Sequence, residues 1–391
     1  MKIVIAPDSF KGNLTAKQVA DAIEIGIKRV IPDAEIVKIP MADGGEGTVQ
    51  ALVDATDGEI ITAEVSDPLE NRIKAEFGIL GDSQKSDQTP FETDQITAVI
   101  EMASASGLPL VPRDKRNPML TTTYGTGELI RIALDKGCRK LIVGIGGSAT
   151  VDGGAGMAQA LGVRLLDKNG NEIPKGGGGL EHLDHIDTTS LDPRITETTT
   201  IVACDVDNPL VGPRGSPEVF GPQKGATPEM VKILDKFLDR YADIIKRDLG
   251  IDIKNIPGAG AAGGLGAGLM AFLGAQLRSG IDIVIDASGL EKHLRDTDIV
   301  ITGEGKIDRQ TIYGKTPIGV ARTAKKYGIP VIAFAGNIGS DSHVVYDNGI
   351  DALMSIISYP MTLDTAMERS KELLADSAER AIRLVNIGKK P

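Results

Sequence analysis

Six short blocks rich in glycine and carboxylates hold the residues of this chain that could do chemistry. Glycine lets backbone N–H groups lie close to an anionic ligand, and carboxylates beside that ligand can hold a divalent metal or accept a proton. The blocks therefore predict a site for a phosphate-bearing ligand together with a metal ion. They span Ala6–Gly12, Ala42–Thr48, Gly144–Gly154, Cys204–Pro209, Pro257–Gly268 and Thr302–Asp308.

Phosphoryl transfer uses carboxylates for Mg²⁺, cationic side chains and close backbone donors, and the blocks hold all three. Standard nucleotide motifs match poorly. A Walker A loop must begin with glycine, whereas Arg309–Thr316 begins with arginine and ends in Gly-Lys-Thr. Gly258–Gly263 spells G-x-G-x-x-G, but only a weak strand precedes it. This second match keeps a nicotinamide-dependent hydroxy-acid dehydrogenase as an alternative function.

A parallel sheet is expected to position the first two blocks. Lys2–Ala6 has the pattern of a strand, and a capping box formed by Thr15 and Gln18 starts the helix after it. Glu35–Ile39 repeats the strand pattern, and another helix follows from Thr48. Ligands of parallel sheets collect beyond the carboxyl ends of the strands. The side chains expected on that rim are Asp8, Ser9, Lys11, Asp43 and Glu46.

The middle of the chain predicts antiparallel structure. Glu59–Ser66 and Arg72–Ile79 have the pattern of a hairpin, and Lys168–Asn171 has that of the turn of another. Residues 84–95 are polar and predict a surface loop.

Strands and helices alternate again near the end of the chain, starting with a strand at Asp298–Thr302. The predicted fold class is therefore α/β with two domains. We expect a discontinuous, doubly wound (Rossmann-like) parallel-sheet domain over residues 1–58 and 290–391, and an inserted α+β domain over residues 59–289. The active site is expected in the cleft between them.

The composition excludes several classes of function. The 391 residues hold 43 Lys and Arg against 54 Asp and Glu, and this net charge of −11 argues against nucleic acids and anionic membranes as partners. Aromatic residues make up only 3% and tryptophan is absent, so stacking surfaces are few. Two cysteines cannot build a disulfide framework, and no apolar run reaches the length of a membrane span. We expect a cytoplasmic protein.

The whole set of blocks resembles the bacterial type of glycerate kinase. Between Ile5 and Asp308 the chain carries, in order, IAPDSFKG, PMADGGEGT, GIGGSAT-x-DGGAGM, ACDVDNPL, FGPQKGA, PGAGAAGGLG and TGEGKID. The resemblance implies ATP-dependent phosphorylation of D-glycerate, usually to the 2-phospho product, by a two-domain fold with one Rossmann-like half. Val151 departs from the Asn or Thr of the family pattern, so a hydrogen bond there is missing or supplied otherwise.

Four residues are predicted to act in catalysis. Asp43 or Asp205 would orient or deprotonate the attacking hydroxyl group. Lys11 and Lys224 would contact the substrate carboxylate or the transferred phosphate. The alternatives are that the aspartates only form turns and that the lysines are solvated residues of surface loops. The residues predicted to bind the substrate are Asp8, Ser9, Lys11, Gly44 and Gly45.

The remaining candidates are assigned to the metal and the nucleotide, because Mg²⁺ prefers carboxylate oxygens and helix starts offer N–H groups to phosphates. Helix capping is the alternative at most of these positions. The predicted metal ligands are Glu46, Asp152, Asp205, Glu304 and Asp308. The predicted nucleotide-binding residues are Gly146, Gly147, Ser148, Gly258, Gly260, Gly263, Gly264 and Lys306.

These observations predict a kinase that uses ATP and Mg²⁺ to convert D-glycerate to 2-phosphoglycerate. A 3-phosphoglycerate product, the dehydrogenase and a non-enzymatic organic-acid-binding protein stay as alternatives. The expected partners are D-glycerate and ATP, without nucleic acid or membrane, and a homo-oligomer is left open.

Overall fold

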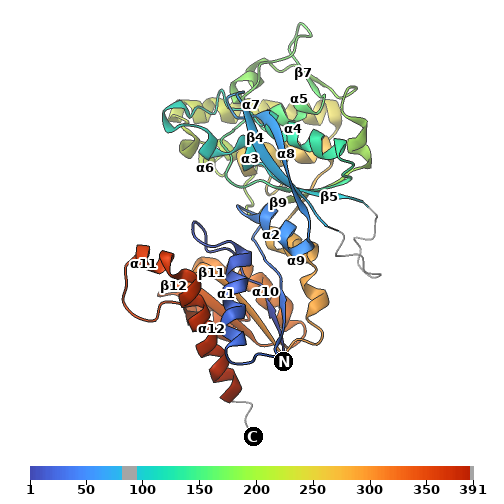
Figure 1. Cartoon of the computed structure of the whole chain (residues 1–391). Helices are drawn as coiled ribbons and strands as arrows, with labels where there is room; N and C mark the ends of the chain where they lie inside the picture. Colours follow the sequence, from blue (N-terminus) through green and yellow to red (C-terminus); the bar gives the residue numbers. More distant parts are fainter. Residues whose placement is uncertain (82–94, 388–391) are drawn as a thin grey trace.

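The computed structural model describes residues 1–81 and 95–387. The loop predicted over residues 84–95 lies outside the described residues except for Gln95. The two ends of the chain lie together in the lower part of Figure 1, and the middle of the chain forms the upper part. The described residues form a five-stranded sheet, a six-stranded sheet and a two-stranded sheet.

The five-stranded sheet is parallel throughout and takes its strands from both ends of the chain. Its order is β13-β12-β11-β1-β2, so the direction of winding reverses between β1 and β11. Doubly wound sheets bind ligands beyond the carboxyl ends of the strands at that switch point. The strands are β1 (Lys2–Ile5), β2 (Glu35–Lys38), β11 (Ile299–Ile307), β12 (Val331–Ile338) and β13 (Ala352–Ser355).

Helices cover both faces of this sheet, because successive side chains of a strand point to opposite faces. Ile3 and Ile5 lie in a buried cluster with side chains of α1 and α12, whereas Val4 lies in another with side chains of α10. The helices are α1 (Ala16–Lys28), α10 (Thr316–Lys325) and α12 (Ser370–Ile387).

Two predicted helix starts are confirmed. Thr15 Oγ1 accepts a hydrogen bond from Gln18 N at 3.2 Å, and the Gln18 side chain accepts one from Thr15 N at 3.1 Å, which completes the capping box of α1. The second helix, α2 (Thr48–Thr56), begins at the predicted residue.

The six-stranded sheet has the order β10-β9-β6-β5-β4-β3. β3 and β4 form the predicted hairpin with the predicted bounds, and β4 also runs antiparallel to β5. The strands β5, β6, β9 and β10 are parallel, so the expectation of an α+β unit is wrong for this part. Parallel neighbours need long crossover connections, which hairpin signals do not reveal. The strands are β3 (Glu59–Ser66), β4 (Arg72–Ile79), β5 (Thr97–Glu101), β6 (Lys140–Gly144), β9 (Thr199–Ala203) and β10 (Gln276–Arg278).

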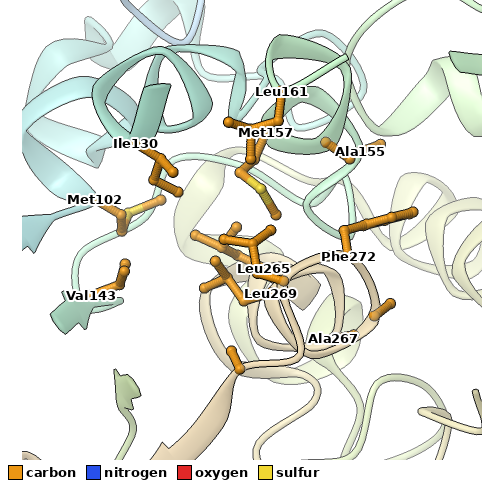
Figure 2. Close-up of a cluster of buried hydrophobic side chains, with 14 of the residues drawn as sticks. Met102, Ile130, Val143, Ala155, Met157, Leu161, Leu265, Ala267, Leu269 and Phe272 are labelled. Carbon is orange, nitrogen blue, oxygen red and sulfur yellow. The ribbon is translucent and has the colours of Figure 1, made fainter. Parts of the chain in front are cut away.

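The main core lies on one face of this sheet. Figure 2 shows Met157, Leu265 and Leu269 near Val143 of β6. All four side chains are fully buried. The helices that supply this core are α4 (Tyr124–Asp135), α5 (Ala155–Ala160), α7 (Pro228–Leu249) and α8 (Ala261–Leu273).

Side chains on the other face of the six-stranded sheet belong to an apolar cluster that also includes the five-stranded sheet. Val99 of β5 lies in a buried cluster with Leu52 of α2 and Ile281 of α9 (Gly280–Ser288). The same cluster contains Val4 of the five-stranded sheet. One continuous apolar cluster therefore runs from sheet to sheet through α2 and α9.

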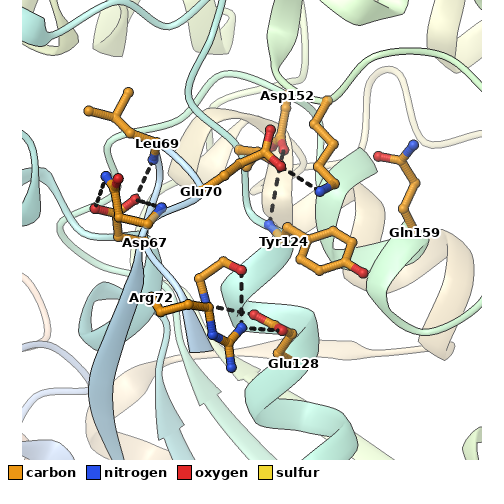
Figure 3. Close-up of polar contacts among 12 residues, drawn as sticks. Asp67, Leu69, Glu70, Arg72, Tyr124, Glu128, Asp152 and Gln159 are labelled. Carbon is orange, nitrogen blue, oxygen red and sulfur yellow. Dashed lines mark hydrogen bonds and ion pairs between the residues drawn. The ribbon is translucent and has the colours of Figure 1, made fainter. Parts of the chain in front are cut away.

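Polar contacts hold the β3–β4 hairpin against α4. Glu128 accepts a hydrogen bond from Ser66 N at 2.6 Å and one from the Arg72 guanidinium at 2.8 Å. Figure 3 shows Arg72 and Glu128 pointing toward each other. Asp67 stabilises the turn by accepting from Leu69 N and Asn71 N at 2.7 and 2.9 Å.

One strand is longer than predicted, and one helix has an irregular first turn. β11 continues past Thr302, because β12 pairs with it as far as Ile307, and it therefore includes Glu304. α8 begins at Ala261, and left-handed φ angles at residues 262–264 interrupt its first turn.

The second predicted hairpin is correct only in its turn. Gly170 has a φ of +81°, but the strand expected after the turn is reduced to a single bridge between Leu166 and Glu172. Pro174 soon follows and cannot donate to a ladder. The strand β7 (Arg164–Leu166) instead pairs with β8 (His185–Asp187).

The remaining helical segments are short. No helix among residues 1–81 and 95–387 is long and apolar enough to cross a membrane. The short α-helices are α3 (Ala103–Ser106), α6 (Ser216–Phe220) and α11 (Leu363–Glu368). Two 3₁₀ helices bear on the site, η5 (Pro222–Lys224) and η7 (Arg309–Ile312).

Candidate functional site

Three predicted site carboxylates lie beyond the carboxyl ends of β1, β2 and β9. Asp8 follows β1, Asp43 lies between β2 and α2, and Asp205 follows β9. Lys11 Nζ lies 3.4 Å from Asp43 Oδ2. Burial raises the pKa of Asp8 and of Asp205, and the Asp43 carboxylate raises both further. The structure thus brings these four residues into one region, and their roles stay predictions.

Asp8 is held in one orientation. It is only 2% exposed, and its oxygens accept hydrogen bonds from Thr316 Oγ1 at 2.9 Å and Ser9 N at 2.6 Å. Burial, with Asp43 as the second cause, raises its pKa to about 6. Burial alone would lower the pKa of Lys11, but Asp43 and Asp8 raise it above its ordinary value. The lysine is therefore a permanent cation beside these two carboxylates.

Close backbone packing brings the Asp43 loop to the six-stranded sheet. A Cβ atom on Gly44 would lie 2.6 Å from Gly280 Cα and 2.9 Å from Ala203 Cβ, and one on Gly280 would collide with the Asp43 carbonyl oxygen. The Gly280 N–H donates to Asp205 Oδ1 at 3.0 Å. Gly44, predicted to bind substrate, thus also permits the contact that brings Asp43 near Asp205.

Glu304 lies within β11, the neighbour of β1 at the switch point. It is 7% exposed, accepts a hydrogen bond from Thr311 Oγ1 at 2.6 Å and lies 3.5 Å from Lys315 Nζ. Burial raises its pKa to about 7, although Thr311 and Lys315 oppose this and Asp8 adds to it. This predicted metal ligand therefore belongs to the Asp8 region.

Of three other predicted residues, Lys306 and Glu46 are exposed and Asp308 is buried. Lys306 pairs with Asp308 at 2.7 Å, and the Lys306 side chain is 60% exposed. Asp308 also caps η7 by accepting a hydrogen bond from Gln310 N at 2.8 Å, as expected if this residue acts as a helix cap. Glu46 is exposed next to the start of α2. The roles of these three residues in binding a metal or a nucleotide stay predictions.

Lys224 is buried inside the protein. It is 2% exposed and donates to Ser148 Oγ at 2.6 Å and to the Thr150 carbonyl at 2.7 Å. Burial lowers its pKa to about 7, against the effect of Asp152. The Gly146–Thr150 loop that it holds lies beside the Asp43 loop, since a Cβ on Gly146 would be 3.9 Å from Gly45 Cα.

Asp152 is fully buried and satisfied by protein donors. It accepts hydrogen bonds from Thr123 N at 2.8 Å, Thr123 Oγ1 at 2.9 Å, Gly154 N at 3.2 Å and Gly156 N at 3.3 Å. Burial raises its pKa while these donors lower it. Its contacts join the starts of α4 and α5. Val151 beside it is buried in the main core, so its departure from the family pattern places an apolar side chain among apolar neighbours.

The glycines of the G-x-G-x-x-G match pack against the chain's own backbone. A Cβ on Gly260 would collide with the Pro209 carbonyl oxygen, and one on Gly263 with that of Thr150. Residues 251–260 contain no strand. The motif therefore lacks the preceding strand that a dinucleotide site requires. The G-x-G-x-x-G match no longer supports a dehydrogenase. Contacts of Gly147, Gly258 and Gly264 with a nucleotide stay predictions.

Two cavities border this region. The smaller, of about 210 Å³, has Ser9, Lys11, Asn13, Glu46 and Gln50 among its lining residues. The larger, of about 540 Å³, is lined by Cys204–Asn208, Ser279, Tyr313 and Gly314.

Among residues 1–81 and 95–387, no group of three or more His, Cys, Asp or Glu side chains is arranged to hold a metal ion. A Mg²⁺ site in a kinase needs only one or two carboxylates, because the nucleotide phosphates supply further oxygens. Asp205 and Asp8 offer oxygens of the right kind in a region where carboxylates outnumber cations, so the residues fit this ion.

Comparison with known proteins establishes the family. The glycerate kinase family matches residues 3–386. The chain belongs to this family. It is 53% identical to the glycerate 2-kinase of Escherichia coli K12 over 99% of both chains, and 55% identical to the glycerate kinase of Halalkalibacterium halodurans over 98% of both. A crystal structure from Salmonella typhimurium LT2, assigned as glycerate kinase 2, matches with a TM-score of 0.90 and 52% identity over 100% of this chain and 99% of that one.

The family predicted from the motifs is thus confirmed, but sequence reasoning missed three residues that lie near the predicted site residues of this glycerate kinase. Lys315 and Thr316, which contact Glu304 and Asp8, belong to the Gly-Lys-Thr sequence that was set aside as an incomplete Walker A loop. Glu101 at the end of β5 accepts a hydrogen bond from Val49 N at 2.9 Å and caps α2. Glu101 carries no local signal, because it lies 52 residues from its partner.

Proposed function

We propose that this chain is an ATP-dependent glycerate kinase that transfers the γ-phosphoryl group to the 2-hydroxyl of D-glycerate. The full-length match to the glycerate kinase family carries the proposal. The juxtaposition of Asp8, Lys11 and Asp43 at the switch point of a doubly wound sheet supports it, because ligands of such sheets bind there.

The side chains suit the parts of this reaction. Asp43 accepts the proton of the attacking hydroxyl, and Lys11 beside it pairs with the carboxylate of the acid. Asp205 and Asp8 would hold Mg²⁺, which would neutralise phosphate oxygens. The small cavity of about 210 Å³ beside Ser9 and Lys11 has room for a three-carbon acid.

The proposal extends to the architecture. The five-stranded sheet takes residues from both ends of the chain and the six-stranded sheet from its middle, which supports two domains over residues 1–58 with 290–391 and over 59–289. Asp205 and Tyr313 both line the larger cavity and come from segments that follow different sheets, which supports a cleft between the domains. A cytoplasmic location and the oligomeric state stay predictions.

Incubation of the purified protein with MgATP and D-glycerate tests the function, with ADP release followed enzymatically and the product identified by phosphorus NMR. We expect 2-phosphoglycerate. A 3-phosphoglycerate signal would show that the protein is a glycerate kinase but that the 3-hydroxyl accepts the phosphoryl group. ATP binding without turnover would contradict D-glycerate as the substrate. Omission of Mg²⁺ should abolish turnover.

A further inference from the structure

The larger cavity contains two apolar side chains that the catalytic proposal does not use. Tyr313 is 71% exposed and Val206 is 42% exposed, and both line the cavity. Tyr313 is the most exposed of the four exposed tyrosines among the described residues. An aromatic ring and an aliphatic side chain suit a flat, uncharged ring system.

The charges of the two cavities differ. The smaller cavity has the cation Lys11 in its wall, as an organic acid requires. The residues that line the larger cavity include Asp205 and Asp207 but no lysine or arginine, and Arg214 pairs with Asp207 at 2.6 Å. A carboxylate or a bare phosphate chain is therefore disfavoured inside it, whereas a neutral base is not.

The volumes point the same way. A cavity of about 540 Å³ lies within the usual range for small-molecule sites, and 210 Å³ is below it. A nucleoside is larger than a three-carbon acid, so the larger of these two cavities suits it better.

We infer that the cavity lined by Cys204–Asn208, Ser279, Tyr313 and Gly314 binds the base and ribose of ATP, with the Tyr313 ring stacked on the base. The inference rests on the proposed function. Asp205 belongs both to this cavity and to the Asp43 region, so a nucleotide placed here has its phosphates directed toward the predicted catalytic residues. Lys315, two residues after Tyr313, lies 3.5 Å from Glu304 of the Asp8 region.

The test compares binding of ATP with binding of tripolyphosphate, which lacks base and ribose, by calorimetry in the presence of Mg²⁺. Tyr313→Ala should weaken ATP binding about tenfold and raise the KM for ATP, because stacking on an aromatic ring is lost. Its affinity for tripolyphosphate and its KM for D-glycerate should stay unchanged. Tyr313→Phe keeps the ring and should bind ATP as the wild type does. Tyr346→Ala, at a tyrosine that is 50% exposed and lines neither cavity, is the matched control.

Three results would overturn the inference: unchanged ATP affinity in Tyr313→Ala, equal losses for ATP and tripolyphosphate, or a rise in the KM for D-glycerate alone. Thermal unfolding of each variant excludes a folding defect, which we do not expect at so exposed a side chain. If the wild type binds ATP without phosphorylating D-glycerate, the proposed function fails while the binding comparison still decides the inference.

Discussion

Asp43 is the carboxylate of the candidate site that contacts Lys11, since Lys11 Nζ lies 3.4 Å away. We expect Asp43→Asn to lower kcat by roughly 10²–10⁴-fold at saturating MgATP and D-glycerate, because the amide cannot accept the hydroxyl proton. Asp364→Asn, at an exposed position of α11, should leave kcat unchanged. A kcat for Asp43→Asn within a few-fold of the wild type would rule out this role.

Glu304 should make stability depend on pH. Its pKa is raised from 4.5 to about 7, chiefly by burial, so the folded protein binds its proton more tightly than the unfolded chain does. The resulting stabilisation is fully present below pH 4.5 and is lost as the pH rises through 7. Asp8, with a pKa raised to about 6, acts in the same direction.

Urea unfolding at pH 5 and pH 8 measures this effect. The free energy of unfolding should fall between the two pH values, and Glu304→Gln should reduce that fall by roughly 1–3 kcal/mol. The fall should not vanish, because Asp8 remains. Glu59→Gln, at an exposed strand position, is the control. An identical pH dependence in the wild type and Glu304→Gln would show that Glu304 titrates normally.

At the scale of elements, the 3₁₀ helix η5 is joined to the loop after β6 by the buried Lys224. Its ammonium donates to Ser148 Oγ and to the Thr150 carbonyl, so the lysine helps to shape the Gly146–Thr150 loop. Only if this loop moves can Lys224 reach a phosphate, because the side chain is 2% exposed.

Lys224→Met is expected to leave those two buried acceptors without a donor. The free energy of unfolding should fall by about 1–3 kcal/mol, and the KM for ATP should rise if the loop contacts the nucleotide. Lys232→Met, on the exposed face of α7, should change neither quantity. Unchanged stability together with lost turnover would instead favour the catalytic role predicted from the sequence.

For the whole molecule, the cluster that contains Val4, Leu52 and Val99 links the two sheets, so we expect them to unfold together. Leu52→Ala should lower the free energy of unfolding by about 2–5 kcal/mol, because Leu52 is fully buried in this cluster. Circular dichroism and tyrosine fluorescence should report one urea transition in both proteins. Leu384→Ala, at a leucine that is 64% exposed, is the control. Two separate transitions in the wild type would contradict the coupling.

The sequence by itself determined the family and the kind of chemistry, because the motifs are local. A glycine-rich loop after a strand, the Thr15 capping box and the Glu59–Ile79 hairpin each depend on residues close together in the chain. Local patterns also predicted that Asp8 and Asp43 lie on one rim, since both follow parallel strands of one sheet.

Only the tertiary structure decided which of these residues are partners and how far each is buried. Thr316 bonds to Asp8 across 308 residues of sequence, and Lys224 bonds to Ser148 across 76. Local patterns could not reveal that Lys224 is buried or that four strands of the middle segment are parallel. The physical reason is that burial, charge environment and strand partners are set by segments that meet only when the chain folds, whereas a motif specifies just its own backbone.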